Sequence, residues 1–246
     1  VVGLWDSAKK ALGLHSEVGG VTLSWKVRQK PNADHTNIGG MLDIMRVNTK
    51  MSPSLRAAAN YFRAVGSDDV LAAGVRLTRD SRGSFDPNIQ RVNVPSRGTG
   101  TTVQEHLAGL SPVEAQVALH EVGHALTHSK IEAWYKDPGS LPPALRAALD
   151  QLDNLSKRYS TELANRRAAG APVDGGAYAT TNLHEFAAEA WTRREVREVL
   201  KGMEGEPVAG IPSSAWREFV NVLARVLGLR KNDGLREATQ LLDVVL

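Results

Sequence analysis

The chain has 246 residues, of which 42% are hydrophobic and 23% charged, so it can form one large domain or two small ones around a hydrophobic core. It contains no cysteine, which excludes disulfides, thiolate zinc fingers, iron–sulfur clusters and a cysteine nucleophile. Any metal must therefore be bound by His, Asp or Glu. The net charge of +3 is small for this length and does not indicate a nucleic-acid partner.

The first half of the chain predicts a small sheet. Residues 21–28 alternate apolar and polar side chains, as a half-buried strand does, and the turn-rich residues 31–40 predict a loop. A helix should begin at Pro53, directly after a serine N-cap. Short strands are expected at 75–77 and 90–94, and the turn-forming residues between them predict that these two strands form a hairpin.

The second half predicts helices. The capping box that starts at Ser111, followed by Pro112, begins a helix that should reach about Ser129. A long helical pattern covers residues 144–169 and stops at a glycine-rich loop, and a further helix covers residues 182–200. After a break at residues 202–207, two shorter amphipathic helices should close the chain.

Strands in the first half and helices in the second indicate an α+β fold rather than alternating βαβ units. We expect a single domain over residues 1–246. Within it, a sheet-containing N-terminal lobe covers residues 1–110, the helices that carry the chemical motifs cover 111–200, and C-terminal helices cover 201–246.

The strongest chemical signal is the motif His120-Glu121-Val122-Gly123-His124, within the helix that starts at the capping box. Residues four apart on a helix lie one turn above each other, so both imidazoles project from one face and can bind one metal ion. Glu121 lies about 100° further around the helix, beside the metal, where a carboxylate can accept a proton from water. The alternative interpretation is an amphipathic helix with two solvated histidines.

The third protein ligand must come from outside this motif. His128 lies two helical turns beyond His120, roughly 12 Å along an unbroken helix, so it cannot reach the same metal. The metzincin spacing fails because Thr127 and Lys130 stand where Gly and His are required. The remaining arrangement takes a carboxylate from a second helix, as gluzincins do, and Glu185 supplies one.

Each candidate on this second helix has a competing interpretation. Asn182 and Glu185 have the spacing of a capping box, which would make Glu185 a local helix cap. His184 is turned about 100° aside and is either an alternative third ligand or a surface residue. Glu189 is either a solvated charge or a carboxylate that orients a ligand imidazole from behind.

The segment YATTNLHEFAAEA, residues 178–190, follows the motif HEVGHA and resembles the catalytic domain of anthrax lethal factor and its relatives. The pattern of that family is Y-x-T-T-N-x-x-E-F-x-A-E-A, and the resemblance covers about residues 85–200. It implies a zincin-like gluzincin domain with a small mixed sheet packed on the active-site helix, a helical C-terminal part, and one Zn²⁺ per chain. Residues 130–177, between the two motifs, are longer than the family pattern leads us to expect.

The resemblance also implies a role for each matched residue. His120, His124 and Glu185 would be the zinc ligands, Glu121 would be the general base, and Glu189 would lie behind the ligands in the second shell.

Two further features would act on the substrate. Tyr178 would donate a hydrogen bond to the oxyanion of a tetrahedral intermediate, whereas without the resemblance it reads as an ordinary packed tyrosine. A substrate-binding edge strand would take up the peptide as an extra strand, the alternative being a plain sheet edge. The predicted edge strand consists of Gln90, Arg91, Val92, Asn93 and Val94.

We therefore expect a zinc-dependent endopeptidase that hydrolyses a peptide or protein substrate, as a toxin or effector domain of a longer polypeptide. The N-terminal residues show neither a signal peptide nor an initiator Met, and no apolar run approaches the roughly 18 residues of a membrane span, so we expect no membrane span in this chain. Secretion or delivery into a target cell is what the resemblance to the lethal factor family implies. The alternative is an inactive or structural zincin-fold module of an injected or virion-associated protein. A metal-dependent hydrolase acting on other bonds is a third interpretation.

Overall fold

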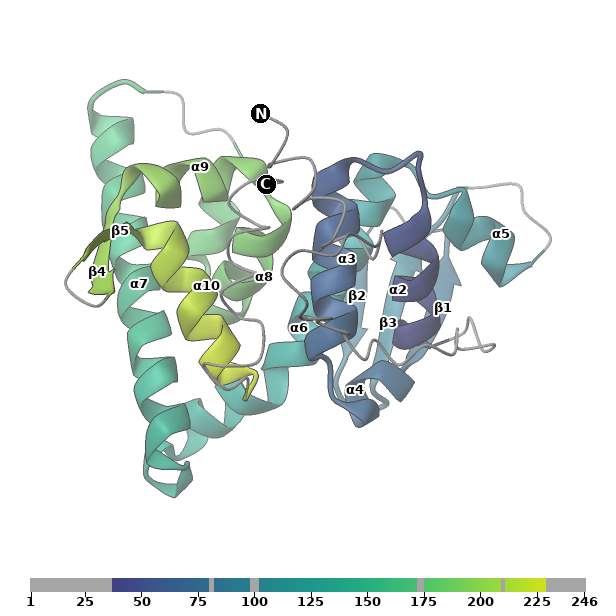
Figure 1. Cartoon of the computed structure of the whole chain (residues 1–246), viewed down its shortest axis with the longest axis horizontal. Coiled ribbons are helices and arrows are strands. Elements are labelled where there is room, and N and C mark those ends of the chain that lie inside the picture. Colours follow the sequence, from purple (N-terminus) through teal and green to yellow (C-terminus); the bar gives the residue numbers. More distant parts are fainter. Residues whose placement is uncertain (1–36, 80–81, 98–101, 172–174, 209–210, 229–246) are drawn as a thin grey trace, which may run out of the picture.

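The computed structural model describes residues 37–79, 82–97, 102–171, 175–208 and 211–228, so the strand predicted at 21–28 and the last predicted helix lie outside the described residues. The described part is mixed α+β, mostly helical, with a small sheet (Figure 1). Its elements are α2 (Ile38–Val47), α3 (Pro53–Val65), α4 (Asp68–Ala72), β1 (Gly74–Thr78), β2 (Ser84–Asp86), β3 (Arg91–Pro95), α5 (Val103–Ala108), α6 (Pro112–Lys136), η1 (Pro138–Ser140), α7 (Pro143–Ala168), η2 (Ala177–Thr180), α8 (Leu183–Thr192), α9 (Arg194–Gly202), β4 (Glu204–Val208), β5 (Ile211–Ser214) and α10 (Ala215–Val226).

Helix α2 occupies part of the segment predicted as a loop at residues 31–40. Asn37 caps this helix, since its side-chain oxygen accepts a hydrogen bond of 2.8 Å from the Gly40 N–H. Met41 and Met45 are then fully buried one turn apart. The loop prediction is wrong from residue 38 onward because burial of this helix outweighs the turn preference of its glycines.

The sheet has the strand order β1–β3–β2, in which β1 is parallel and β2 antiparallel to β3. The hairpin predicted between the strands at 75–77 and 90–94 is therefore wrong, because the hairpin joins β2 to β3. Strand β2 is only three residues long and lies within the run of turn formers between them, so composition alone did not reveal it.

Strand β3 is the middle strand, and the prediction of a substrate-binding edge strand at Gln90–Val94 is wrong. Gln90 precedes the strand with a φ of 47°, and residues 91–93 pair with neighbours on both sides. Val92 and Val94 are fully buried, which favours a central position under α6. The outer strand nearest to Glu121 is β2, since a Cβ on Gly83 just before it would lie 2.9 Å from the Glu121 Cγ.

Helix α6 begins with the predicted capping box. The Ser111 hydroxyl accepts from the Glu114 N–H at 3.3 Å, and the Glu114 carboxylate accepts from the Ser111 N–H at 2.8 Å. The helix continues beyond Ser129 to Lys136 because the first helix-breaking residue is Pro138. Its unbroken course keeps the spacing of its histidines regular.

The helix predicted over residues 182–200 is two helices. Arg193 has an extended backbone (φ −97°, ψ 120°) and separates α8 from α9. The break predicted after α9 contains β4, which pairs antiparallel with β5. Helix α10 then matches the first of the two predicted C-terminal helices.

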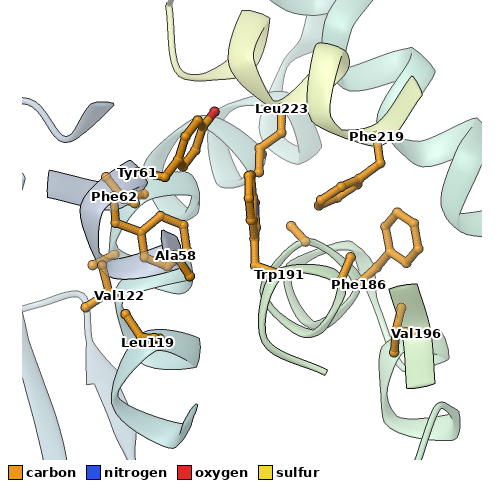
Figure 2. Packing of buried hydrophobic residues seen from close by; sticks show 14 of the residues in the cluster. Ala58, Tyr61, Phe62, Leu119, Val122, Phe186, Trp191, Val196, Phe219 and Leu223 are labelled. Atoms are coloured by element: carbon orange, nitrogen blue, oxygen red, sulfur yellow. The ribbon is translucent and has the colours of Figure 1, made fainter. Parts of the chain in front are cut away.

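One hydrophobic cluster connects residues from α2 to α10. Helices α6 and α8 lie in its middle, with α2, α3 and the sheet on one side and α7, α9 and α10 on the other (Figure 1). Trp191 of α8 lies between α3 and α10 (Figure 2), with ring centroids 4.6 Å from Tyr61 and 5.8 Å from Phe219. In the described residues, no helix is both long enough and apolar enough to cross a bilayer.

Candidate metal centre

The two histidines of the motif lie side by side on α6. Their Nε2 atoms are 3.0 Å apart, their ring centroids are 4.6 Å apart, and both side chains are largely buried, with 12% and 13% exposed. Because the opposite face of α6 carries the buried Ala118 and Val122, packing against the core fixes the direction in which His120 and His124 project. Two freely solvated histidines do not fit this burial.

Helix α8 brings Glu185 to the pair. Its Oε2 atom lies 3.2 Å from the His120 Nε2 and 3.4 Å from the His124 Nε2. Ligands bound tetrahedrally at about 2.0–2.1 Å are separated by roughly 3.3 Å, so the three atoms have the spacing of one tetrahedral face. The three residues can hold a metal ion.

At the start of α8, Asn182 caps the helix, so the Glu185 side chain is available to face the two histidines. The Asn182 side chain accepts a hydrogen bond of 2.9 Å from the Glu185 N–H and thereby caps the helix. The Glu185 carboxylate faces the histidines, so the interpretation of Glu185 as a capping residue is not supported. A close approach of the helices helps, since a Cβ on Gly123 of α6 would lie 3.3 Å from the Ala188 Cα of α8.

Glu189 supports His120 from behind. Its Oε1 atom lies 3.1 Å from the His120 Nδ1, and its Oε2 atom lies 2.8 Å from the Arg193 Nε. The Glu189 side chain is 4% exposed, which excludes the interpretation as a solvated charge. A carboxylate behind a ligand imidazole fixes its tautomer and orientation. The sequence did not identify Arg193, whose side chain pairs with this carboxylate, as a site residue.

Glu121 is buried beside the pair, at 7% exposure, under the sheet edge formed by β2. Burial raises the pKa of its carboxyl, while the neighbouring His120 and His124 lower it and a backbone hydrogen bond from Phe85 lowers it further. The net pKa is above its ordinary value, which is the direction a general base near neutral pH requires.

The histidines and carboxylates of this cluster shift each other's pKa values: the pKa of His120 is raised and that of Glu185 is lowered. Burial alone would lower the pKa of His120, but the carboxylates of Glu185 and Glu189 outweigh it and raise this pKa to about 9. Burial alone would raise the pKa of Glu185, but His120 and His124 hold it well below its ordinary value. His120 and the carboxylates of Glu185 and Glu189 thus favour each other's charged forms.

Tyr178 stands at the open side of the centre. Its ring centroid is 6.4 Å from that of His120, and the side chain is 53% exposed. Partial burial and the nearby Glu185 carboxylate raise the pKa of its phenol. The Tyr159 hydroxyl of α7 donates a hydrogen bond of 3.0 Å to the Gly176 carbonyl, which anchors the glycine-rich loop just before Tyr178. Tyr159 was not among the candidate site residues found from the sequence.

The remaining candidates lie elsewhere. The His184 Nε2 lies 2.8 Å from the Glu132 Oε1, and although its ring centroid is 6.4 Å from that of His124, His184 does not belong to the His120–His124–Glu185 set. His128 lies one turn beyond His124 and belongs with Glu132 and His184, as the spacing on an unbroken helix predicts. In the described part of the chain, no residue of the predicted strand Gln90–Val94 belongs to the ligand set.

Comparison with known proteins adds no relative, because no protein-family model, no curated protein and no solved structure matches the chain.

Proposed function

We propose that this chain is a zinc-dependent endopeptidase of the gluzincin type, similar to the catalytic domain of lethal factor. The observation that carries the proposal is the convergence of His120, His124 and Glu185 within 3.0–3.4 Å, with the buried carboxyl of Glu121 beside them. Two imidazoles and one carboxylate suit zinc, and three protein ligands leave a coordination position open, as catalytic zinc sites do.

The protein groups around this set match the steps of amide hydrolysis. Zinc, when bound, supplies a Lewis acid that lowers the pKa of water and polarises a carbonyl group. Glu121 accepts the proton of the attacking water and returns it to the leaving amine, for which its raised pKa is suited. Tyr178 donates a hydrogen bond from its phenol to the developing oxyanion.

The substrate would bind along β2. This strand is the outer strand next to Glu121, and its outer edge, which pairs with no other strand among the described residues, offers backbone groups to an extended peptide. The substrate is therefore a peptide or protein segment in an extended conformation. A role as a toxin or effector, secreted or delivered into a target cell, follows from the resemblance to lethal factor.

The test combines metal analysis with an activity assay. The purified chain should bind zinc and cleave casein or members of a peptide library. Glu121→Gln should keep the zinc and lose at least about 100-fold in kcat, because general-base catalysis contributes at least that much.

The matched control is Glu198→Gln on α9, which removes an exposed carboxylate that is paired with Lys201 and belongs to neither ligand group, and should leave cleavage unchanged. Cleavage by Glu121→Gln at the parent rate would refute the mechanism. Bound zinc without turnover on any peptide, ester or amide would instead favour the structural module.

A further inference from the structure

A second set of metal-ligating side chains lies along the same face of α6. His120, His124, His128 and Glu132 follow one another at intervals of four residues, which places them in one row along the helix. The first two belong to the centre described above. His128 and Glu132 lie further along, where they meet His184 of α8.

The geometry brings these three residues together. The His184 Nε2 lies 2.8 Å from the Glu132 Oε1, and the His128 and His184 rings are 5.0 Å apart at 30° to each other. One ligand atom from each residue lies within 4.8 Å of the others. Tetrahedral ligands are about 3.3 Å apart, so small side-chain rotations would bring separations of up to 4.8 Å to that spacing, and Glu132, whose side chain is 55% exposed, has room to rotate.

We infer that His128, Glu132 and His184 form a second binding site for a divalent transition-metal ion. Two imidazoles and one carboxylate favour Zn²⁺, Co²⁺, Ni²⁺ or Cu²⁺ over Mg²⁺ and Ca²⁺, which prefer oxygen ligands only. The hydrogen bond to Glu132 satisfies only one nitrogen of His184. Its Nδ1 is buried and has no hydrogen-bond partner among the described residues, so the three side chains do not form a completed hydrogen-bond network of their own.

The second site binds its ion more weakly than the first, for two reasons. Glu189 lies behind His120, but no such carboxylate stands behind His184 in the described residues, and loss of such support typically weakens a metal site 10- to 100-fold. Corresponding ligands of the two sites are about two helical turns apart, roughly 12 Å along α6, so an ion in the first site weakly repels an ion in the second. The expected order of filling is the first site, then the second.

Counting ions in the full-length chain tests this inference. In a zinc titration against a competing chelator, the parent should bind two ions, the second at least about 10-fold more weakly. Glu132→Gln and His128→Ala should each bind one ion with the parent's higher affinity, which also shows that these variants fold. Glu198→Gln removes a carboxylate of similar exposure, 51%, and should keep both ions.

His120→Ala should lose the tight ion and keep the weak one, which distinguishes the two sites. A Co²⁺ titration should give visible absorption from both ions in the parent and from one ion in Glu132→Gln. Binding of a single ion by the parent, or two ions by both Glu132→Gln and His128→Ala, would overturn the inference. These readouts count ions and do not depend on peptide cleavage, so the absence of peptidase activity would refute the proposed function without affecting this site.

Discussion

At the scale of single residues, Glu121 and Glu185 show how one residue type suits the two different roles that we propose for them in one cluster. Burial dominates at Glu121 and raises its pKa, whereas the two histidines dominate at Glu185 and lower its pKa. A metal ligand must be ionised, and a general base must be able to take up a proton near neutral pH. The two environments therefore separate the two roles before any metal is present.

The raised pKa of His120 predicts how zinc binding depends on pH. In the metal-free chain, the pKa of about 9 lies above the ordinary 6.5, so this proton stabilises the fold fully below about pH 6.5 and the contribution is lost as pH rises through about 9. Zinc must displace this proton. We expect zinc affinity to rise about tenfold per pH unit from about pH 7 up to about 9 and then to level off.

The measurement is a chelator competition at several pH values, with the number of released protons followed by a pH indicator. An affinity independent of pH across this range would show that His120 is not protonated in the metal-free chain.

At the scale of elements, the contact between α6 and α8 determines where Glu185 stands. Gly123 permits this contact, because a Cβ there would already lie 3.3 Å from the Ala188 Cα and 3.4 Å from its Cβ. The glycine therefore lets the two backbones approach this closely without a shift of α8, although glycine inside a helix costs about 1 kcal/mol relative to alanine.

Gly123→Val should push α8 away from α6 and move Glu185 out of the ligand set. We expect zinc affinity to fall at least about 10-fold, even though valine favours the helix more than glycine does. Ser129→Val places the same side chain on an exposed position of α6 and should leave the affinity unchanged. Zinc affinity equal to that of the parent in Gly123→Val would mean that the contact does not position the ligand.

The sequence predicts those elements whose signals are local. Capping residues and proline positions gave the starts of α3 and α6, and the spacing of His120 and His124 gave two of the three ligands of the centre. The strand order was not predictable, because β2 has three residues and is stabilised by pairing with β3 rather than by its own composition. The pairing of Glu189 with Arg193 was not predictable either, because it depends on α8 ending at Arg193.

At the scale of the whole molecule, aromatic side chains join the two halves around α8. Phe219 of α10 is fully buried and has ring centroids 5.7 Å from Phe186, 5.8 Å from Trp191 and 5.6 Å from Trp216. The continuous cluster suits the prediction of a single catalytic domain over residues 1–246, which stays a prediction because residues 1–36 and 229–246 lie outside the described part.

Phe219→Ala should lower the free energy of unfolding by about 3–5 kcal/mol, because it leaves a cavity among packed rings. Urea denaturation measures this loss. Val47→Ala, at a position that is 65% exposed, should change the free energy of unfolding by less than about 0.5 kcal/mol. A loss of similar size in both variants would contradict the central place of the aromatic cluster.

The ligand set also ties together distant parts of the chain, since His124 and Glu185 are about 60 residues apart in the sequence. An ion held between them closes a loop of that length, and a permanent link across such a loop restricts the unfolded chain by about 4 kcal/mol in the chain-entropy model. In a chain with no cysteine, this link is reversible: it forms when the ion enters and opens when the ion leaves. If the chain binds the ion as we propose, the metal supply of the surroundings would control how readily the polypeptide unfolds.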